Sequence, residues 1–299
     1  MKGITKTAGQ FDMFDINGVE KLSLESVENR EAIIKRYCEV EDSIFYISHS
    51  SGKDSMAQYE VIKRIVPAEK IVVIHATLGK YEHKGVIRHI EENIDEELVV
   101  VKNEKRSLVD SVLLRGMWFS PKYRTCTSDF KTNPIDRFIK ADMKRRGVTV
   151  AFNCLGLRAE ESNQRAQKSP LFINNRLSTT GKQVKRVVFD WFPIFHYLTD
   201  DVWAEVASAG KRMHPAYGAF AGDKNERLSC CLCIMGSSND LLLGASENPE
   251  IYAEYIAVEK VISHTMFVKS KQKTTTEYIE DLVSGELIPK KTTVRTVIP

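Results

Sequence analysis

The 299-residue sequence contains no long apolar run, and no window approaches the roughly 18 consecutive apolar residues that a membrane-spanning helix needs. Its first residues also lack the apolar core of a signal peptide. Six cysteines are too few for a disulfide scaffold in a chain of this length. These absences predict a cytoplasmic protein with no membrane partner. The net charge of +3 excludes no class of partner.

Internal repeats and low-complexity linkers are absent too, so the order of short patterns carries the organisation. Apolar runs rich in β-branched residues alternate with amphipathic stretches. The runs lie at 43–47, 71–74, 98–101, 148–152 and 187–189. This alternation predicts an α/β fold, a parallel twisted sheet with helices on both faces, whose ligands gather at the carboxyl ends of the strands.

Beyond residue 195 the pattern changes to helical stretches around a cysteine-rich loop. We therefore predict three parts. They are an N-terminal helical segment over 1–39, a nucleotide-binding α/β domain over 40–195, and a mostly helical C-terminal extension over 196–299.

A phosphate-binding loop is predicted directly after the first apolar run, where small polar residues precede a helical pattern. Small residues allow backbone N–H groups to approach phosphate oxygens, and a helix N-terminus adds partial positive charge. The Walker A spacing is absent. An ordinary capped turn is the alternative. The candidate ligands are Ser48, Ser50, Ser51, Gly52, Lys53, Asp54 and Ser55, with Lys53 and Asp54 also catalytic and Asp54 a metal ligand or helix cap.

Two histidines are further candidates for the nucleotide site. His49 lies inside it, where it contacts phosphate or lies on the surface. His75 ends the second apolar run, where it lines an adenine pocket or only closes the strand. The sequence alone leaves both alternatives open.

Positive charge is concentrated between residues 115 and 146, where nine Lys or Arg face three Asp. Such a segment fits a polyanion or a nucleotide. The alternative is a solvated helix face, carrying Arg137, Lys140, Lys144 and Arg145 at helical spacing.

The predicted loop resembles the PP-loop of the ATP pyrophosphatase superfamily, whose pattern is Ser-Gly-Gly-x-Asp-Ser. Ser51 stands in the place of the first glycine. We expect its φ to be negative or only mildly strained.

Further ordered motifs resemble the phosphoadenosine phosphosulfate (PAPS) reductase-like family. They are Arg124–Lys131, Gly156–Ser162 followed by Arg165, Pro193-Ile194 followed by Leu198–Trp203, and His214–Tyr217 leading into Cys230–Cys233. The resemblance implies that Gly156 and Arg158 bind the nucleotide, with Arg158 also catalytic. It implies substrate contacts for Arg124, Lys131, Glu161 and Arg165. A surface ion pair with Glu161 is the alternative for Arg158.

Cys230 and Cys233 have the C-x-x-C spacing that brings two thiolates to one metal. Cys231 is an additional candidate, and the resemblance implies that Cys126 lies near the same pocket. Together these cysteines predict a [4Fe–4S] cluster, with zinc as the alternative. A redox pair, or plain buried cysteines, remains open.

The resemblance also separates two chemistries. Sulfate-reducing relatives carry a nucleophilic cysteine in their tail, and residues 270–299 contain none. The retained Gly52-Lys53-Asp54-Ser55 indicates ATP with Mg. The chain therefore looks nearest to DNA phosphorothioation-type sulfurtransferases, which implies adenylation of a nucleic acid or nucleotide and displacement of AMP by sulfur. The sulfur or electron donor would be a cysteine desulfurase or a thioredoxin-like protein.

Two other functions are carried as alternatives. One is a PAPS reductase that uses an external thiol. The other is a non-catalytic nucleotide-binding subunit of a DNA-modification system. The sequence leaves the oligomeric state open.

Overall fold

The computed structural model describes residues 27–39, 42–179, 185–217, 227–267 and 276–277, and the chain forms two compact units. The first unit contains residues up to Ala76, Gly85–Val101 and Thr132–Met213. The second contains Thr77–Lys84, Lys102–Lys131 and residues from His214 onward. Both units are discontinuous in sequence, so the predicted linear division at residue 195 does not coincide with them.

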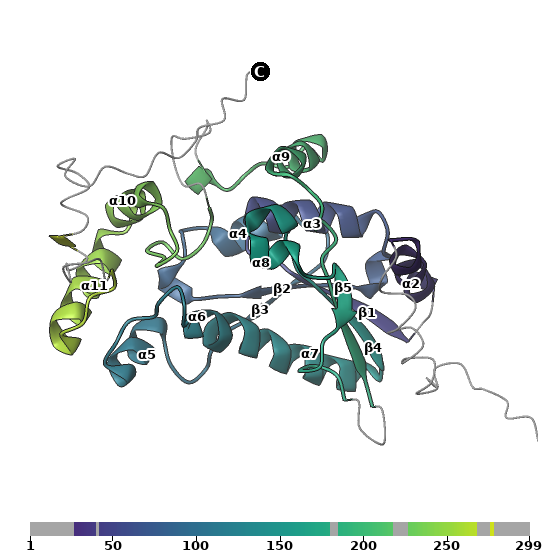
Figure 1. Cartoon of the computed structure of the whole chain (residues 1–299), viewed down its shortest axis with the longest axis horizontal. Coiled ribbons are helices and arrows are strands. Elements are labelled where there is room, and N and C mark those ends of the chain that lie inside the picture. Colours follow the sequence, from purple (N-terminus) through teal and green to yellow (C-terminus); the bar gives the residue numbers. More distant parts are fainter. Residues whose placement is uncertain (1–26, 40–41, 180–184, 218–226, 268–275, 278–299) are drawn as a thin grey trace, which may run out of the picture. The chain divides into compact units, whose positions relative to one another are not determined.

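The first unit is built on a six-stranded sheet with the order β3-β2-β1-β4-β6-β5 (Figure 1). The strands β1, β2, β3, β4 and β6 run parallel, as the sequence predicts. A short antiparallel strand, β5, closes one edge, and its three residues were too few to be recognised as an apolar run. The bounds are β1 Ser43–Ser48, β2 Ile71–Ala76, β3 Leu98–Val101, β4 Val150–Cys154, β5 Leu171–Ile173 and β6 Val187–Trp191.

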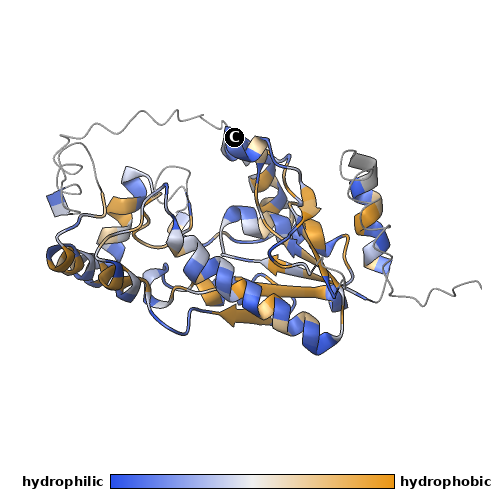
Figure 2. Cartoon of the chain, turned by 60° about the horizontal axis from the view of Figure 1, so that its bottom comes forward, coloured by the Kyte–Doolittle hydropathy of each residue, from blue (hydrophilic) through white to orange (hydrophobic). Residues whose placement is uncertain are grey.

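Helices cover both faces of this sheet (Figure 1). On one face Ile44 and Tyr46 pack with Ile139 and Met143 of α7. On the other, Phe45 stacks on Phe152 with ring centroids 4.5 Å apart. The strands are mostly hydrophobic in Figure 2, as expected for strands buried on both faces. The helices of this unit are α2 Val27–Glu39, α3 Lys53–Lys63, α4 Val86–Glu91, α7 Asn133–Arg146, α8 Asn163–Ala166 and α9 Thr199–Ser208. The predicted doubly covered α/β fold is confirmed.

The second unit has its own apolar core, in which the Trp118 and Tyr255 rings lie 4.7 Å apart. Its helices are α5 Leu108–Arg115, α6 Thr125–Thr127, α10 Ser238–Glu247 and α11 Pro249–Ile262. Capping boxes at Ser107 and Ser237 start α5 and α10. A π-helical turn, Ser128–Thr132, follows α6.

Among the residues that the structure describes, no helix combines the length and the apolar character needed to cross a bilayer.

Candidate functional site

The predicted phosphate loop joins β1 to α3 at the carboxyl end of the central strand. The Ser55 hydroxyl donates to the Gly52 carbonyl at 2.7 Å and accepts the Ser50 N–H at 3.2 Å. The helix begins after Gly52, and no side chain caps it there. The first turn of α3 therefore offers backbone N–H groups and the positive end of the helix dipole to an anion.

Ser51 departs from the sequence expectation, because its φ is 64° and its backbone is left-handed. That conformation costs a non-glycine residue roughly 1–2 kcal/mol. The buried side chain of Ser51 lies against His89, with Oγ 2.6 Å from Nδ1. His89 Nε2 lies 2.8 Å from the Arg212 carbonyl, which can only accept, so Nε2 carries the proton. Nδ1 therefore accepts from Ser51. Sequence reasoning missed His89, since no local pattern links it to the loop.

His49 is buried and does not lie on the surface. Its Nδ1 accepts the Ser51 N–H at 3.2 Å, and its carbonyl lies 2.9 Å from His75 Nδ1. Burial, together with the neighbouring His75 and His89, lowers the pKa of His49 to about 3. A neutral His49 therefore supports the loop backbone, and His75 supports His49.

Arg158 is buried, and its charge is neutralised within the unit. Its Nε donates to Asp54 at 2.7 Å, and its Nη1 lies 2.5 Å from Glu160. Burial alone would lower the pKa of Arg158, but the two carboxylates raise it. Asp54 also pairs with Lys53 at 3.2 Å. The alternative of a side-chain ion pair between Arg158 and Glu161 is not observed: the only group of Arg158 that donates to the Glu161 carboxylate is the backbone N–H, at 3.1 Å.

The carboxylate of Glu161 instead pairs with Arg165. Glu160, which sequence reasoning did not select, also accepts from Thr199 at 2.9 Å. Burial tends to raise the pKa of Glu160, but its bonds to Thr199 and Arg158 lower it. The segment after β4 is thus a closed network of ion pairs around Arg158.

Gly156 is required by space. A Cβ there would lie 2.7 Å from the Asp54 carbonyl oxygen and 3.0 Å from its carbon. Neither atom belongs to a flexible side chain. The segment after β4 can approach the start of α3 only with glycine at this position.

The loop carries groups that suit an anion. The Ser48 Oγ and the His49 Nε2 are buried and have no hydrogen-bond partner among the described residues. The N-terminus of α3 is uncapped, and Lys53 supplies a cation. Asp54, the predicted metal ligand, is already engaged by Lys53 and Arg158.

The cysteine-rich loop lies in the second unit. Cys126, Cys230 and Cys233 influence one another electrostatically, and Lys131 acts on all three. The hydrogen bond from Cys230 lowers the pKa of Cys233 to about 6, while burial opposes that shift. The same bond raises the pKa of Cys230.

Cys231 has a different environment from these three cysteines, because it packs in the apolar core of its unit. Burial raises the pKa of Cys231 to about 11. A Cβ on Gly244 would lie 1.8 Å from the Cys231 carbonyl oxygen, so the backbone of α10 packs directly against the loop. This placement favours packing over metal binding for Cys231.

The metal site predicted at the cysteine-rich loop stays a prediction. In the described ranges, no three His, Cys, Asp or Glu side chains are grouped to hold a metal ion. Cys126, Cys230 and Cys233 interact with one another as thiols in this structure.

The basic residues divide into paired and unpaired groups. On α7, Arg145 and Arg146 both pair with the buried Asp142, so part of the predicted basic face is neutralised. Arg124 and Lys131, in the second unit, have no carboxylate within 4.0 Å in the part of the chain that is described. Arg124 is exposed and Lys131 half-buried.

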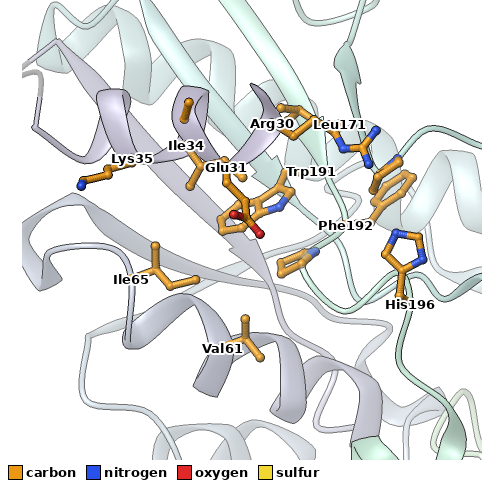
Figure 3. Close-up of a pocket in the computed structure, with 13 residues that line it drawn as sticks. Arg30, Glu31, Ile34, Lys35, Val61, Ile65, Leu171, Trp191, Phe192 and His196 are labelled. Carbon is orange, nitrogen blue, oxygen red and sulfur yellow. The ribbon is translucent and has the colours of Figure 1, made fainter. Parts of the chain in front are cut away.

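A cavity of about 610 Å³ lies elsewhere in the first unit, bordered by α2, α3 and the end of β6 (Figure 3). Trp191 and Phe192 form an apolar wall, and Glu31 and Lys35 lie on α2. None of the predicted site residues lines it.

The sequence and the fold that form this site can be compared with those of known families. The sequence model of the phosphoadenosine phosphosulfate reductase domain matches residues 44–225, more than half of the chain. The chain belongs to this family. The match to the PAPS reductase family supports nucleotide-related chemistry.

Individual relatives are distant. An uncharacterized 37.8 kDa protein in the gpa 5' region of Escherichia phage 186 is 22% identical over 220 residues, which cover 73% of this chain and 62% of that protein. The chain thus spans less than two thirds of that relative.

Among solved structures, the Candida auris PAPS reductase in a phosphate complex aligns with a TM-score of 0.42 and 12% identity. The alignment covers 69% of this chain and 91% of that one. The Candida glabrata FMN adenylyltransferase with FMN and an ATP analogue gives a TM-score of 0.36 and 12% identity, over 66% of this chain and 63% of that one.

Gly156→Ala is expected to displace the start of α3, because backbone atoms of Asp54 occupy the space that the new Cβ needs. Overpacking of this kind costs about 1–3 kcal/mol of stability. Hydrogen exchange of residues 52–56 should accelerate. Gly147→Ala is the control, since its Cβ would meet open space and only the left-handed backbone is strained. Equal exchange in both variants would contradict the close approach.

Ser51→Gly and His89→Ala are expected to be coupled. Glycine relieves the left-handed strain at position 51, and without Oγ that residue no longer depends on His89. His89→Ala should therefore cost about 1 kcal/mol more in the wild-type background than in the Ser51→Gly background. The free energies of unfolding of the four proteins measure this. Strictly additive effects would show that His89 does not hold Ser51.

Proposed function

We propose that this protein is an ATP-dependent adenylyl and sulfur-transfer enzyme that acts on a nucleic acid or nucleotide. The observation that carries the proposal is the uncapped N-terminus of α3. It follows a loop that is held by the Ser51–His89 hydrogen bond and by the close approach of Gly156. A phosphate chain is the ligand that such a site favours. The family supports nucleotide chemistry, and the sulfur-transfer branch is our inference.

In the proposed reaction, an oxygen of the substrate attacks the α-phosphorus of ATP. A new O–P bond forms, the bond from phosphorus to pyrophosphate breaks, and pyrophosphate leaves. The N–H groups at the start of α3 and the Lys53 ammonium would stabilise charge on the phosphate oxygens. Asp54 would act by orienting Lys53 and Arg158, which it contacts.

The second half of the proposed reaction delivers sulfur. The terminal sulfur of a donor persulfide bonds to the activated atom as AMP leaves with the oxygen. A second thiol then releases the donor as a disulfide. The donor would be a cysteine desulfurase or a thioredoxin-like protein. Mg is expected to accompany ATP. Asp54 would not be its ligand, because this carboxylate already pairs with Lys53 and Arg158.

A nucleic-acid substrate is supported by the second unit, where Lys122, Arg124 and Lys131 have no acidic partner in the described structure. Phosphate contacts of unpaired cations release counterions and strengthen binding. The exposed Lys144 on α7 adds to the charge of the first unit.

A second candidate is supported by the family itself. A PAPS reductase using an external thiol would release sulfite from PAPS and would release no pyrophosphate from ATP. The two functions are therefore distinguished by their products, sulfite or pyrophosphate.

Lys53→Ala is expected to weaken ATP binding and to reduce pyrophosphate release by about 100-fold, because one preorganised charge at the transferring phosphate is lost. Asp54→Asn should reduce release while disturbing affinity less, since it removes the orienting ion pairs. Lys63→Ala is the control: it lies on the same helix but is partly exposed and pairs with Asp95. Nucleotide titration and a pyrophosphate assay are the measurements. Unchanged affinity and release in Lys53→Ala would refute the proposed site.

A further inference from the structure

A short exposed loop, residues 120–124, projects from the core of the second unit. It follows Trp118 and Phe119, which are each only 4% exposed. The Ser120 Oγ accepts the Tyr123 N–H at 3.1 Å, which closes a tight turn. After α6, the buried Phe130 returns the chain to the core. The loop is therefore anchored at both ends by aromatic residues.

Tyr123 is the unusual residue in this loop, because 62% of it is exposed. The same unit buries the aromatic residues Trp118, Phe119, Phe130 and Tyr255. Burying an aromatic side chain is strongly favourable, so a tyrosine presented on a closed turn forgoes that stabilisation. Lys122 Nζ lies 5.3 Å from the centre of its ring. Solvent exposure and an adjacent cation together suit a stacking contact.

Two cations flank Tyr123 in the sequence. Lys122 and Arg124 are exposed and have no carboxylate within 4.0 Å among the described residues. Arg115 donates to the Thr125 hydroxyl beside the loop. Because a hydroxyl carries no charge, this bond does not neutralise the guanidinium. By contrast, Arg145, Arg146 and Arg158 are all paired with carboxylates. The loop is thus a place where the basic segment 115–146 offers its charge to a partner.

We propose that Tyr123 stacks on an unpaired nucleobase while Lys122 and Arg124 contact the flanking phosphates. Aromatic residues interleaved with cations are the means by which proteins bind single strands without reading sequence. A duplex would not suit this loop, since stacking within a helix covers the base faces. The inference rests on the proposed nucleic-acid substrate and specifies its form as single-stranded or locally unpaired.

The test uses the full-length protein and fluorescently labelled DNA of about 20 nucleotides, single-stranded or duplex, followed by anisotropy over a range of salt concentrations. Tyr123→Ala should weaken single-strand binding by about 5- to 150-fold and leave the salt dependence unchanged, because stacking carries no charge. Tyr123→Phe should keep wild-type affinity. Lys122→Ala with Arg124→Ala should reduce the slope of log affinity against log salt by about 1.4, for two lost phosphate contacts on a single strand.

Leu114→Ala is the matched control, because Leu114 is also a large exposed apolar residue of this unit, at 72% exposure, and carries no ring. It should bind like wild type. Unchanged ATP affinity and circular dichroism establish that each variant is folded. Equal affinity of Tyr123→Ala and wild type, or a preference for duplex, would overturn this inference alone. No DNA binding by wild type at low salt would overturn it together with the nucleic-acid substrate, while pyrophosphate release would still report on the ATP site.

Discussion

The guanidinium of Arg158 is buried between Asp54, in the first turn of α3, and Glu160, which follows β4. A buried charge is costly unless it is paired and hydrogen-bonded, and here two carboxylates and nearby oxygens satisfy it. The interaction joins two segments that are far apart in sequence. Because β1 and β4 are neighbouring parallel strands, their carboxyl ends bring these segments together. The absence of a side chain at Gly156 then permits the backbones to meet. The geometry of the phosphate loop depends on this junction.

The loop also depends on a compensation on its other side. A left-handed serine is strained, and a glycine would adopt the same turn freely. The structure offsets this strain by burying Ser51 against His89 and giving its N–H to His49. The burial that keeps His49 neutral also keeps its Nδ1 able to accept that bond. A departure from the glycine pattern is therefore tolerated through two histidines on different elements. The result is a loop whose left-handed residue is held by side chains.

Much of this fold could be predicted because its signals are local. Buried parallel strands read as continuous apolar runs, and the strand, small-residue loop and helix follow one another in sequence. The short edge strand β5 could not, since three residues carry no periodicity. The partners of Arg158 and Ser51 could not be predicted either, because hydrogen bonds between residues far apart in the sequence produce no recognisable spacing of residue types. Cys231 illustrates the same limit: it is adjacent to Cys230 in sequence, yet it packs in the apolar core while Cys230 interacts with Cys233.

The basic segment 115–146 shows how the structure changes the interpretation of a sequence pattern. Counting Lys and Arg over 115–146 treats every cation alike, but Asp142 neutralises two of them at the end of α7. Asp142 is itself buried beneath Tyr46, so those arginines stabilise the fold by pairing a carboxylate that would otherwise be costly. Burial tends to raise the pKa of Asp142, and the bonds from Arg145, Arg146 and Tyr46 reverse that and lower it. Lys122, Arg124 and Lys131 in the second unit, and Lys144 on α7 in the first, have no acidic partner among the described residues. A count of basic residues therefore overstates the charge that α7 offers to a polyanion, because part of that charge is already neutralised inside the fold.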